Sequence, residues 1–125
     1  MNEPMKKILV VEDDDLNREI LSDYLAAKGY ELVTAATGPE GVERFHQTAP
    51  DLMLVDIQLP CKNGFEVCFE VKASRDVPVL LMSAVYTDTA HARPYAERGL
   101  KAEGYLVKPF AMTELLDRVQ QLIGT

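Results

Sequence analysis

The sequence predicts an α/β protein in which five parallel strands form one doubly wound sheet. Three observations lead to this prediction. Five apolar runs alternate along the chain with five segments that are expected to be helical. The run Leu52–Val55 is unbroken, as in central parallel strands that are covered on both faces. The 125 residues, 47% apolar and 26% charged, suit one globular domain. Right-handed crossovers then place helices on both faces of the sheet.

The first predicted strand is Lys6–Val11, and the acidic run Glu12–Asp15 follows it directly. Asp14 or Asp15 can cap the next helix, because carboxylates favour the positive end of the helix dipole. In this helix, apolar residues recur at helical spacing: Leu16, Ile20, Leu21, Tyr24 and Leu25. Gly29 is the predicted C-terminal stop.

The second predicted strand is Glu31–Ala36, and the stretch Thr37–Glu40 after it has the capping-box pattern. The helix that begins there ends before Pro50, and its predicted inward residues are Val42, Phe45 and Ala49. The third strand is expected to end at Asp56. A third helix follows from Gly64, with an apolar face made of Phe65, Val67, Cys68 and Val71.

The fourth predicted strand is Asp76–Ser83, with Pro78 near its start, where a missing backbone donor matters least. A polar helix is expected over residues 87–98; it contains Pro94 and ends at Gly99. The fifth strand is Gly104–Lys108. The last helix covers residues 112–123 and lacks a capping side chain at Ala111; its inward residues are Leu115, Leu116, Val119, Leu122 and Ile123.

Composition narrows the possible partners and the compartment. The net charge of −7 argues against binding of nucleic acid or anionic membranes, since both require basic surface. No apolar run approaches the length of a membrane span. Cys61 and Cys68 have no metal-binding spacing, so we expect two free thiols in a reducing, cytoplasmic compartment.

Polar side chains at four strand ends are expected to meet, because the loops that follow parallel strands open on one edge of the sheet. They are Glu12 with Asp13, then Asp56, Ser83 and Lys108. Two unit charges 4 Å apart interact by about 4 kcal/mol at an effective dielectric of 20. The three carboxylates must therefore take up protons, splay apart or bind a cation. Hard oxygen ligands suit Mg²⁺ better than zinc or copper.

The same edge is suited to phosphoryl chemistry. Asp56 is a candidate nucleophile, since carboxylates form aspartyl-phosphates in proteins. Ser83 could donate a hydrogen bond to a phosphoryl oxygen, and Lys108 could pair with Asp56 at rest and with the phosphoryl group afterwards. Positioning and charge neutralisation would supply most of the acceleration.

Four stretches in order resemble the receiver domain of bacterial two-component response regulators, in particular single-domain, chemotaxis-regulator-like members. They are Ile8–Asp13, Asp56–Pro60 with Gly64, Leu81–Ala84 and Tyr105–Phe110. The resemblance covers about residues 6–123 and implies one receiver domain over residues 1–125. It also implies the flavodoxin-like (βα)5 fold with strand order 2-1-3-4-5.

The resemblance implies roles for individual residues. Asp56 matches the phosphoacceptor and would also supply a metal ligand. Glu12 and Asp13 match the acidic pair, with Asp13 as its direct metal ligand. Glu12 would reach the Mg²⁺ through water, whereas Gln58 would bind it through its backbone carbonyl. The remaining matches are the switch residues Ser83 and Tyr105, the lysine Lys108, and a Lys108–Pro109 bond that is often cis in the family.

The resemblance also implies partners. A sensor histidine kinase or histidine phosphotransfer protein would supply the phosphoryl group, and a downstream protein would bind the face formed by residues 87–98, strand five and the last helix. The chain would be a monomer or a weak, phosphorylation-dependent dimer. It would catalyse its own modification without turning over a free substrate. By the same resemblance, Gln58 and Val85 occupy positions that tune phosphoryl lifetime in the family.

The chain departs from the family pattern between Ser83 and Tyr105. This interval is longer than usual, and the extra residues fall in the segment that contains Pro94. Tyr86 could share or replace the role of Tyr105. His46 and His91 are expected on solvated helix surfaces.

Three other functions compete. An aspartyl phosphatase or phosphotransferase often needs a second Asp two residues after the nucleophile, where this chain has Gln58. A flavin binder of the same fold needs a neutral first loop, which Glu12–Asp15 does not provide. The complete set of pocket residues argues against a docking module that is independent of phosphorylation, whereas the altered segment around Pro94 keeps this alternative open.

Overall fold

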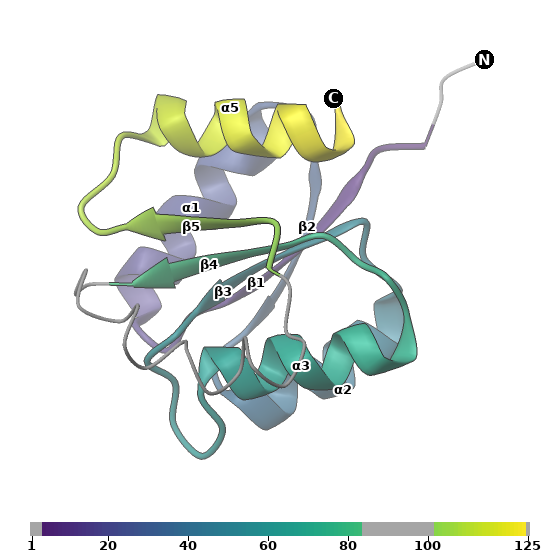
Figure 1. The fold of residues 1–125 in the computed structure, drawn as a ribbon. Helices are drawn as coiled ribbons and strands as arrows, with labels where there is room; N and C mark the ends of the chain where they lie inside the picture. Colours follow the sequence, from purple (N-terminus) through teal and green to yellow (C-terminus); the bar gives the residue numbers. More distant parts are fainter. Residues whose placement is uncertain (1–3, 84–101, 125) are drawn as a thin grey trace.

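Figure 1 shows the computed structural model of the chain, which describes residues 4–83 and 102–124. Its elements in order are β1 Lys7–Val11, α1 Asp15–Ala27, β2 Glu31–Ala35, α2 Gly38–Thr48, β3 Leu52–Asp56, α3 Gly64–Ser74, β4 Val79–Ser83, β5 Gly104–Val107 and α5 Met112–Ile123. The helix expected over residues 87–98 lies outside the described residues, as do Val85, Tyr86, His91, Pro94 and Gly99.

The five strands form one parallel sheet in the order β2-β1-β3-β4-β5, as the resemblance implied. The described ranges hold four helices. The pairing register aligns the strand ends: Val11 lies opposite Val55, and Ser83 lies opposite Val107. The loops after β1, β3 and β5 therefore start from one edge of the sheet.

Helices cover both faces of the sheet: α1 and α5 lie on one face, and α2 and α3 lie on the other (Figure 1). Alternate residues of the buried strands point to opposite faces. On β3, Met53 and Val55 pack with the α2 and α3 side, whereas Leu52 and Leu54 pack with the α1 and α5 side. This two-sided burial explains why the run Leu52–Val55 has no polar interruption.

Side chains cap three helices, and two of these caps are at the expected positions. Asp14 accepts a hydrogen bond from the Asn17 amide at the start of α1, and Thr37 accepts one from the Glu40 amide at the start of α2. Asn63 caps α3 in the same way. Ala111 makes no side-chain cap for α5, as expected.

One predicted core residue is wrong. Ala49 was expected to face inward on the second helix, but it is exposed and caps the end of α2 with φ +46°. The backbone enters the left-handed region there because the chain must reverse before Pro50. Among the described helices, none is long and apolar enough to cross a membrane.

Two apolar residues of the predicted periodic face of α1 are exposed. Leu21 and Leu25 are buried against the sheet, whereas Leu16 is 64% and Ile20 48% exposed. Both cysteines are free thiols, as predicted; Cys61 is exposed and Cys68 is buried. Burial raises the pKa of Cys68 to about 12, so this thiol stays protonated at neutral pH.

Candidate functional site at the carboxyl edge of the sheet

The strand ends bring the predicted polar residues to one edge. Glu12 follows β1 directly, Asp56 and Ser83 are the last residues of β3 and β4, and Lys108 follows β5. Glu12, Asp56 and Ser83 are buried, whereas Asp13 is exposed. The convergence that topology predicted is therefore present, and it combines a buried acidic floor with an exposed carboxylate at the rim.

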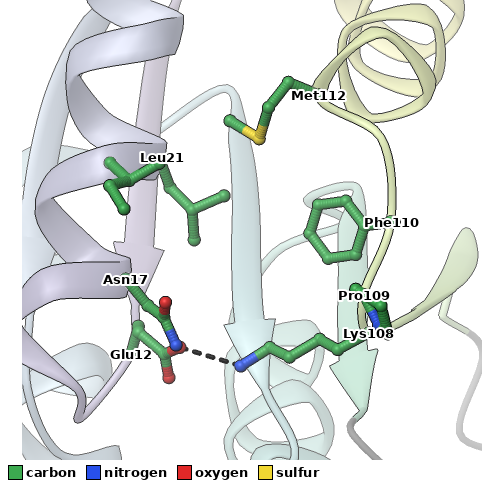
Figure 2. Close-up of a pocket in the computed structure, with 8 residues that line it drawn as sticks. Glu12, Asn17, Leu21, Lys108, Pro109, Phe110 and Met112 are labelled. Carbon is green, nitrogen blue, oxygen red and sulfur yellow. Dashed lines mark hydrogen bonds and ion pairs between the residues drawn. The ribbon is translucent and has the colours of Figure 1, made fainter.

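Lys108 bridges two buried carboxylates. Its Nζ lies 2.5 Å from Asp56 Oδ2 and 2.8 Å from Glu12 Oε1. Figure 2 shows the lysine side chain extending toward Glu12, with the dashed line marking that contact. The Lys108 side chain is 23% exposed and that of Glu12 only 1%, so the lysine side chain runs from the surface of the site to the buried carboxylates. Charge-assisted hydrogen bonds of this kind offset part of the cost of burying the acids.

The protonation equilibria reflect this crowding. Burial raises the pKa of Glu12 from 4.5 to about 7. The adjacent Asp56 carboxylate acts in the same direction because a proton on Glu12 would bridge the two groups, whereas Lys108 opposes the rise. Burial alone would lower the pKa of Lys108, but hydrogen bonds to Asp56 and Glu12 outweigh it. The net shift is upward, so the lysine stays charged.

The carboxylates fit a divalent cation. Glu12, Asp13 and Asp56 each offer one oxygen, and these oxygens lie within 4.8 Å of one another. Among the buried side-chain polar atoms of residues 4–83 and 102–124, Glu12 Oε2 alone has no hydrogen-bond partner. An unsatisfied buried oxygen is costly in a folded protein, and a cation or its water shell would satisfy it. The all-oxygen donor set is typical of Mg²⁺ sites.

The loop after β3 fixes Asp56 from the other side. The Gln58 amide donates to Asp56 Oδ1 at 2.8 Å, and the Gly64 amide donates to the Ile57 carbonyl at 2.8 Å. A Cβ on Gly64 would lie 2.4 Å from the Asp56 carbonyl oxygen and 2.7 Å from Ile57 Cα. Only glycine therefore lets α3 begin so close to the strand end.

The remaining predicted residues lie along β4 and β5. Ser83 is buried, and its carbonyl accepts a hydrogen bond from the Lys108 amide at 2.7 Å, which ties the two strand ends together. Tyr105 lies on β5 opposite Leu81 and is half-exposed. The Lys108–Pro109 peptide bond is cis, as the resemblance led us to expect. His46 is exposed, also as expected.

A groove of about 530 Å³ opens beside Glu12 and Lys108 (Figure 2). It lies between α1 and the segment that joins β5 to α5. Its other lining residues are mostly apolar: Asn17, Ile20, Leu21, Pro109, Phe110 and Met112. The polar site thus continues into an apolar surface.

One residue of the site was not anticipated. Arg18 on α1 donates from Nη1 to the Glu12 carbonyl at 2.9 Å. The sequence contains a signal for it, because a cation near the positive end of a helix is unfavourable without another partner.

Comparisons with known proteins agree with this geometry. The family model described as the response regulator receiver domain matches residues 8–120. The probable transcriptional regulator ycf27 of Guillardia theta is 37% identical over 121 residues, which are 97% of this chain and 46% of that protein. Response regulator RR06 of Streptococcus pneumoniae is 34% identical over 116 residues, 93% of this chain and 52% of that protein. The chain thus spans about half the length of these relatives.

A solved structure is also similar. The response regulator protein TrrA of Thermotoga maritima, in complex with Mg²⁺ and BeF, is 34% identical with a TM-score of 0.84, and the match covers 95% of this chain and 100% of that one. Sequence and fold agree over nearly the whole chain. The chain therefore belongs to the response regulator receiver domain family.

Proposed function

We propose that this chain is a phosphorylation-dependent signalling switch in which Asp56 accepts a phosphoryl group from a phosphohistidine. The donor would be a sensor histidine kinase or a histidine phosphotransfer protein. The observation that carries the proposal is the setting of Asp56. This carboxylate ends a central strand, and one oxygen accepts from the Gln58 amide while the other pairs with Lys108.

We further propose that Mg²⁺ binds at this edge. Asp13 and Asp56 would hold it directly, Glu12 would do so through water, and the Gln58 carbonyl would complete the protein's share. The clustered carboxylate oxygens and the unsatisfied Glu12 oxygen support this assignment, as does the Mg²⁺ complex of the similar TrrA protein. When bound, the ion would neutralise charge on the entering phosphoryl group.

In the transfer step, the phosphorus–nitrogen bond of the donor breaks, and a bond forms between phosphorus and an Asp56 carboxylate oxygen. The imidazole keeps the electron pair of the broken bond. Lys108, already 2.5 Å from Asp56, would then pair with a phosphoryl oxygen. The Ser83 hydroxyl would donate to another phosphoryl oxygen. These residues act once on their own chain, so no free substrate is turned over.

The donor must reach Asp56 from the edge of the sheet, where the surface beside the site is apolar. Leu16 and Ile20 are exposed one turn apart on α1, and Ile20 also lines the groove. Together with the apolar lining of the groove, they form an exposed apolar surface of the type that can serve as a protein contact site. We therefore place the phosphodonor protein over α1 and this groove.

The output would leave through the β5 edge of the sheet. Ser83 and Lys108 are joined through the backbone, so movement at the site would pass to β5 and the half-exposed Tyr105. A downstream protein would bind the face of β5, α5 and the segment between β4 and β5, with the chain acting as a monomer or a weak dimer. The two free cysteines support a cytoplasmic location.

The test is incubation with acetyl phosphate and Mg²⁺, followed by intact mass measurement. The wild type should gain one phosphoryl group, and Asp56→Asn should gain none. Asp51→Asn is the matched control, because Asp51 lies just before the other end of β3 and should leave modification unchanged. An unmodified, folded wild type would overturn the proposal.

A further inference from the structure

Arg18 connects the start of α1 to the backbone of the acidic pair Glu12–Asp13. Its Nη1 donates to the Glu12 carbonyl at 2.9 Å, and its Nη2 pairs with Asp15 Oδ1 at 2.5 Å. The arginine side chain is 21% exposed, whereas that of Asp15 is 90% exposed. One nitrogen of the planar guanidinium group therefore bonds the backbone of the site, and the other pairs with a solvent-exposed carboxylate.

The Glu12 peptide is held on its other side by β2. Its amide donates to the Ala35 carbonyl at 3.0 Å. Directly after the acidic pair, Asp14 is fixed by its capping bond to the Asn17 amide at 2.8 Å. The backbone that carries Glu12 and Asp13 is thus anchored by three hydrogen bonds, and of their three donors only Arg18 is charged.

The ion pair with Asp15 does not explain the role of an arginine at position 18. Ion pairs with a solvent-exposed partner contribute little to stability, and Asp15 is almost fully exposed. The charge of Arg18 does not explain this role either, because a positive side chain beside the site would repel a divalent cation and weaken its binding. What Arg18 can add to the site is a fixed position for the Glu12 carbonyl, and hence for the two carboxylates next to it.

We propose that Arg18 is a positioning residue for metal binding: it holds the Glu12–Asp13 backbone so that both carboxylates face Asp56. The inference rests on the proposed Mg²⁺-dependent function, and it concerns a residue that does not itself contact the ion. Loss of a group that orients metal ligands typically costs about tenfold or more in metal affinity.

The test is the dissociation constant of Mg²⁺, measured by isothermal titration calorimetry on wild type, Arg18→Met and Arg18→Lys. Positioning predicts that Arg18→Met binds Mg²⁺ about tenfold more weakly. Arg18→Lys should also bind more weakly, because lysine keeps the charge but lacks the rigid fork. Charge alone predicts the opposite for Arg18→Met, which would bind more tightly, and no change for Arg18→Lys.

Arg44→Met on the exposed surface of α2 is the matched control and should leave the Mg²⁺ dissociation constant unchanged. Urea unfolding in EDTA separates a general loss of stability from a loss of affinity, since affinities are compared only where every variant is folded. If Arg18→Met does not fold, Arg18→Lys decides the question. Amide chemical shifts of Glu12 and Asp13 should move in both Arg18 variants and stay in place in the control.

Equal or tighter Mg²⁺ binding by Arg18→Met, or by a folded Arg18→Lys when the methionine variant is unfolded, overturns the inference. The outcome is distinct from failure of the proposed function. If the wild type binds Mg²⁺ but takes no phosphoryl group from acetyl phosphate, the switch function falls, and weaker binding by the Arg18 variants still supports the positioning role. If the wild type binds no Mg²⁺, both fall.

Discussion

Replacing Glu12 by Gln should stabilise the metal-free protein above neutral pH. The substitution keeps the size of the side chain and the acceptor that faces Lys108 Nζ, 2.8 Å away in the wild type. It removes a carboxylate that is 1% exposed and crowded by Asp56. Glutamine also turns the unsatisfied Glu12 Oε2 position into a donor that can reach the neighbouring carboxylate.

The magnitude follows from proton linkage. Burial raises the pKa of Glu12 from 4.5 to about 7 in the folded state. A folded-state pKa above the unfolded value contributes relative stability that is present below pH 4.5 and is lost as pH rises to about 7. The difference corresponds to about 3 kcal/mol. Glu12→Gln has no such loss, so it should be more stable than the wild type by about 3 kcal/mol above pH 7, and the advantage should disappear near pH 4.5.

Urea unfolding in EDTA at pH 8 and at pH 4.5 measures this difference directly. Glu19→Gln, on the exposed surface of α1, removes a charge without this burial and should show little effect at either pH. Adding Mg²⁺ should stabilise the wild type more than Glu12→Gln, because binding to the folded state adds stability. A Glu12→Gln protein that is less stable than the wild type at pH 8 without metal would refute the reasoning.

Two further predictions concern the loop after β3 and the approach of the donor. Gly64→Ala should destabilise the fold by about 1–3 kcal/mol, because its Cβ would lie 2.4 Å from the Asp56 carbonyl oxygen and force backbone to move. Urea unfolding measures the loss of stability. The comparison variant is Ala73→Gly in the exposed part of α3, which should cost only helix propensity, about 1 kcal/mol. An unchanged unfolding midpoint for Gly64→Ala would contradict the close packing at Gly64. Ile20→Glu should slow phosphotransfer from a phosphorylated histidine phosphotransfer domain by about tenfold, as loss of a central interface contact does, while leaving modification by acetyl phosphate intact. Gln47→Glu on α2 adds the same charge elsewhere and should have no effect, whereas equal slowing by both variants would place the donor away from α1.

Local sequence patterns determined most of the fold. The unbroken run Leu52–Val55 identified a strand buried on both faces, because no polar group can be tolerated on either side of it. Capping residues such as Asp14 and Thr37 located helix starts to within a residue, since their side chains satisfy amides in the first turn. The order of the elements then implied parallel strands, and hence one shared edge for the acids.

Periodicity could not decide which helical residues face the core. Ala49 continued the apolar spacing of α2, yet it caps the helix with a positive φ, because the connection to β3 requires a reversal there. Leu16 and Ile20 fit the apolar repeat of α1, yet they remain exposed because Leu21 and Leu25 fill the space against the sheet. Such choices depend on how the helix is rotated against its neighbours.

For the candidate site, the sequence by itself determined the residue types and their common edge: Asp56, the acidic pair, Ser83 and Lys108. Only the tertiary structure decided how they share charge. The 2.5 and 2.8 Å contacts of Lys108, the unsatisfied oxygen of Glu12 and the hold of Arg18 on its carbonyl are distances between separate elements. Local propensity carries no information on such distances, because packing of α1 and β5 against the sheet sets them.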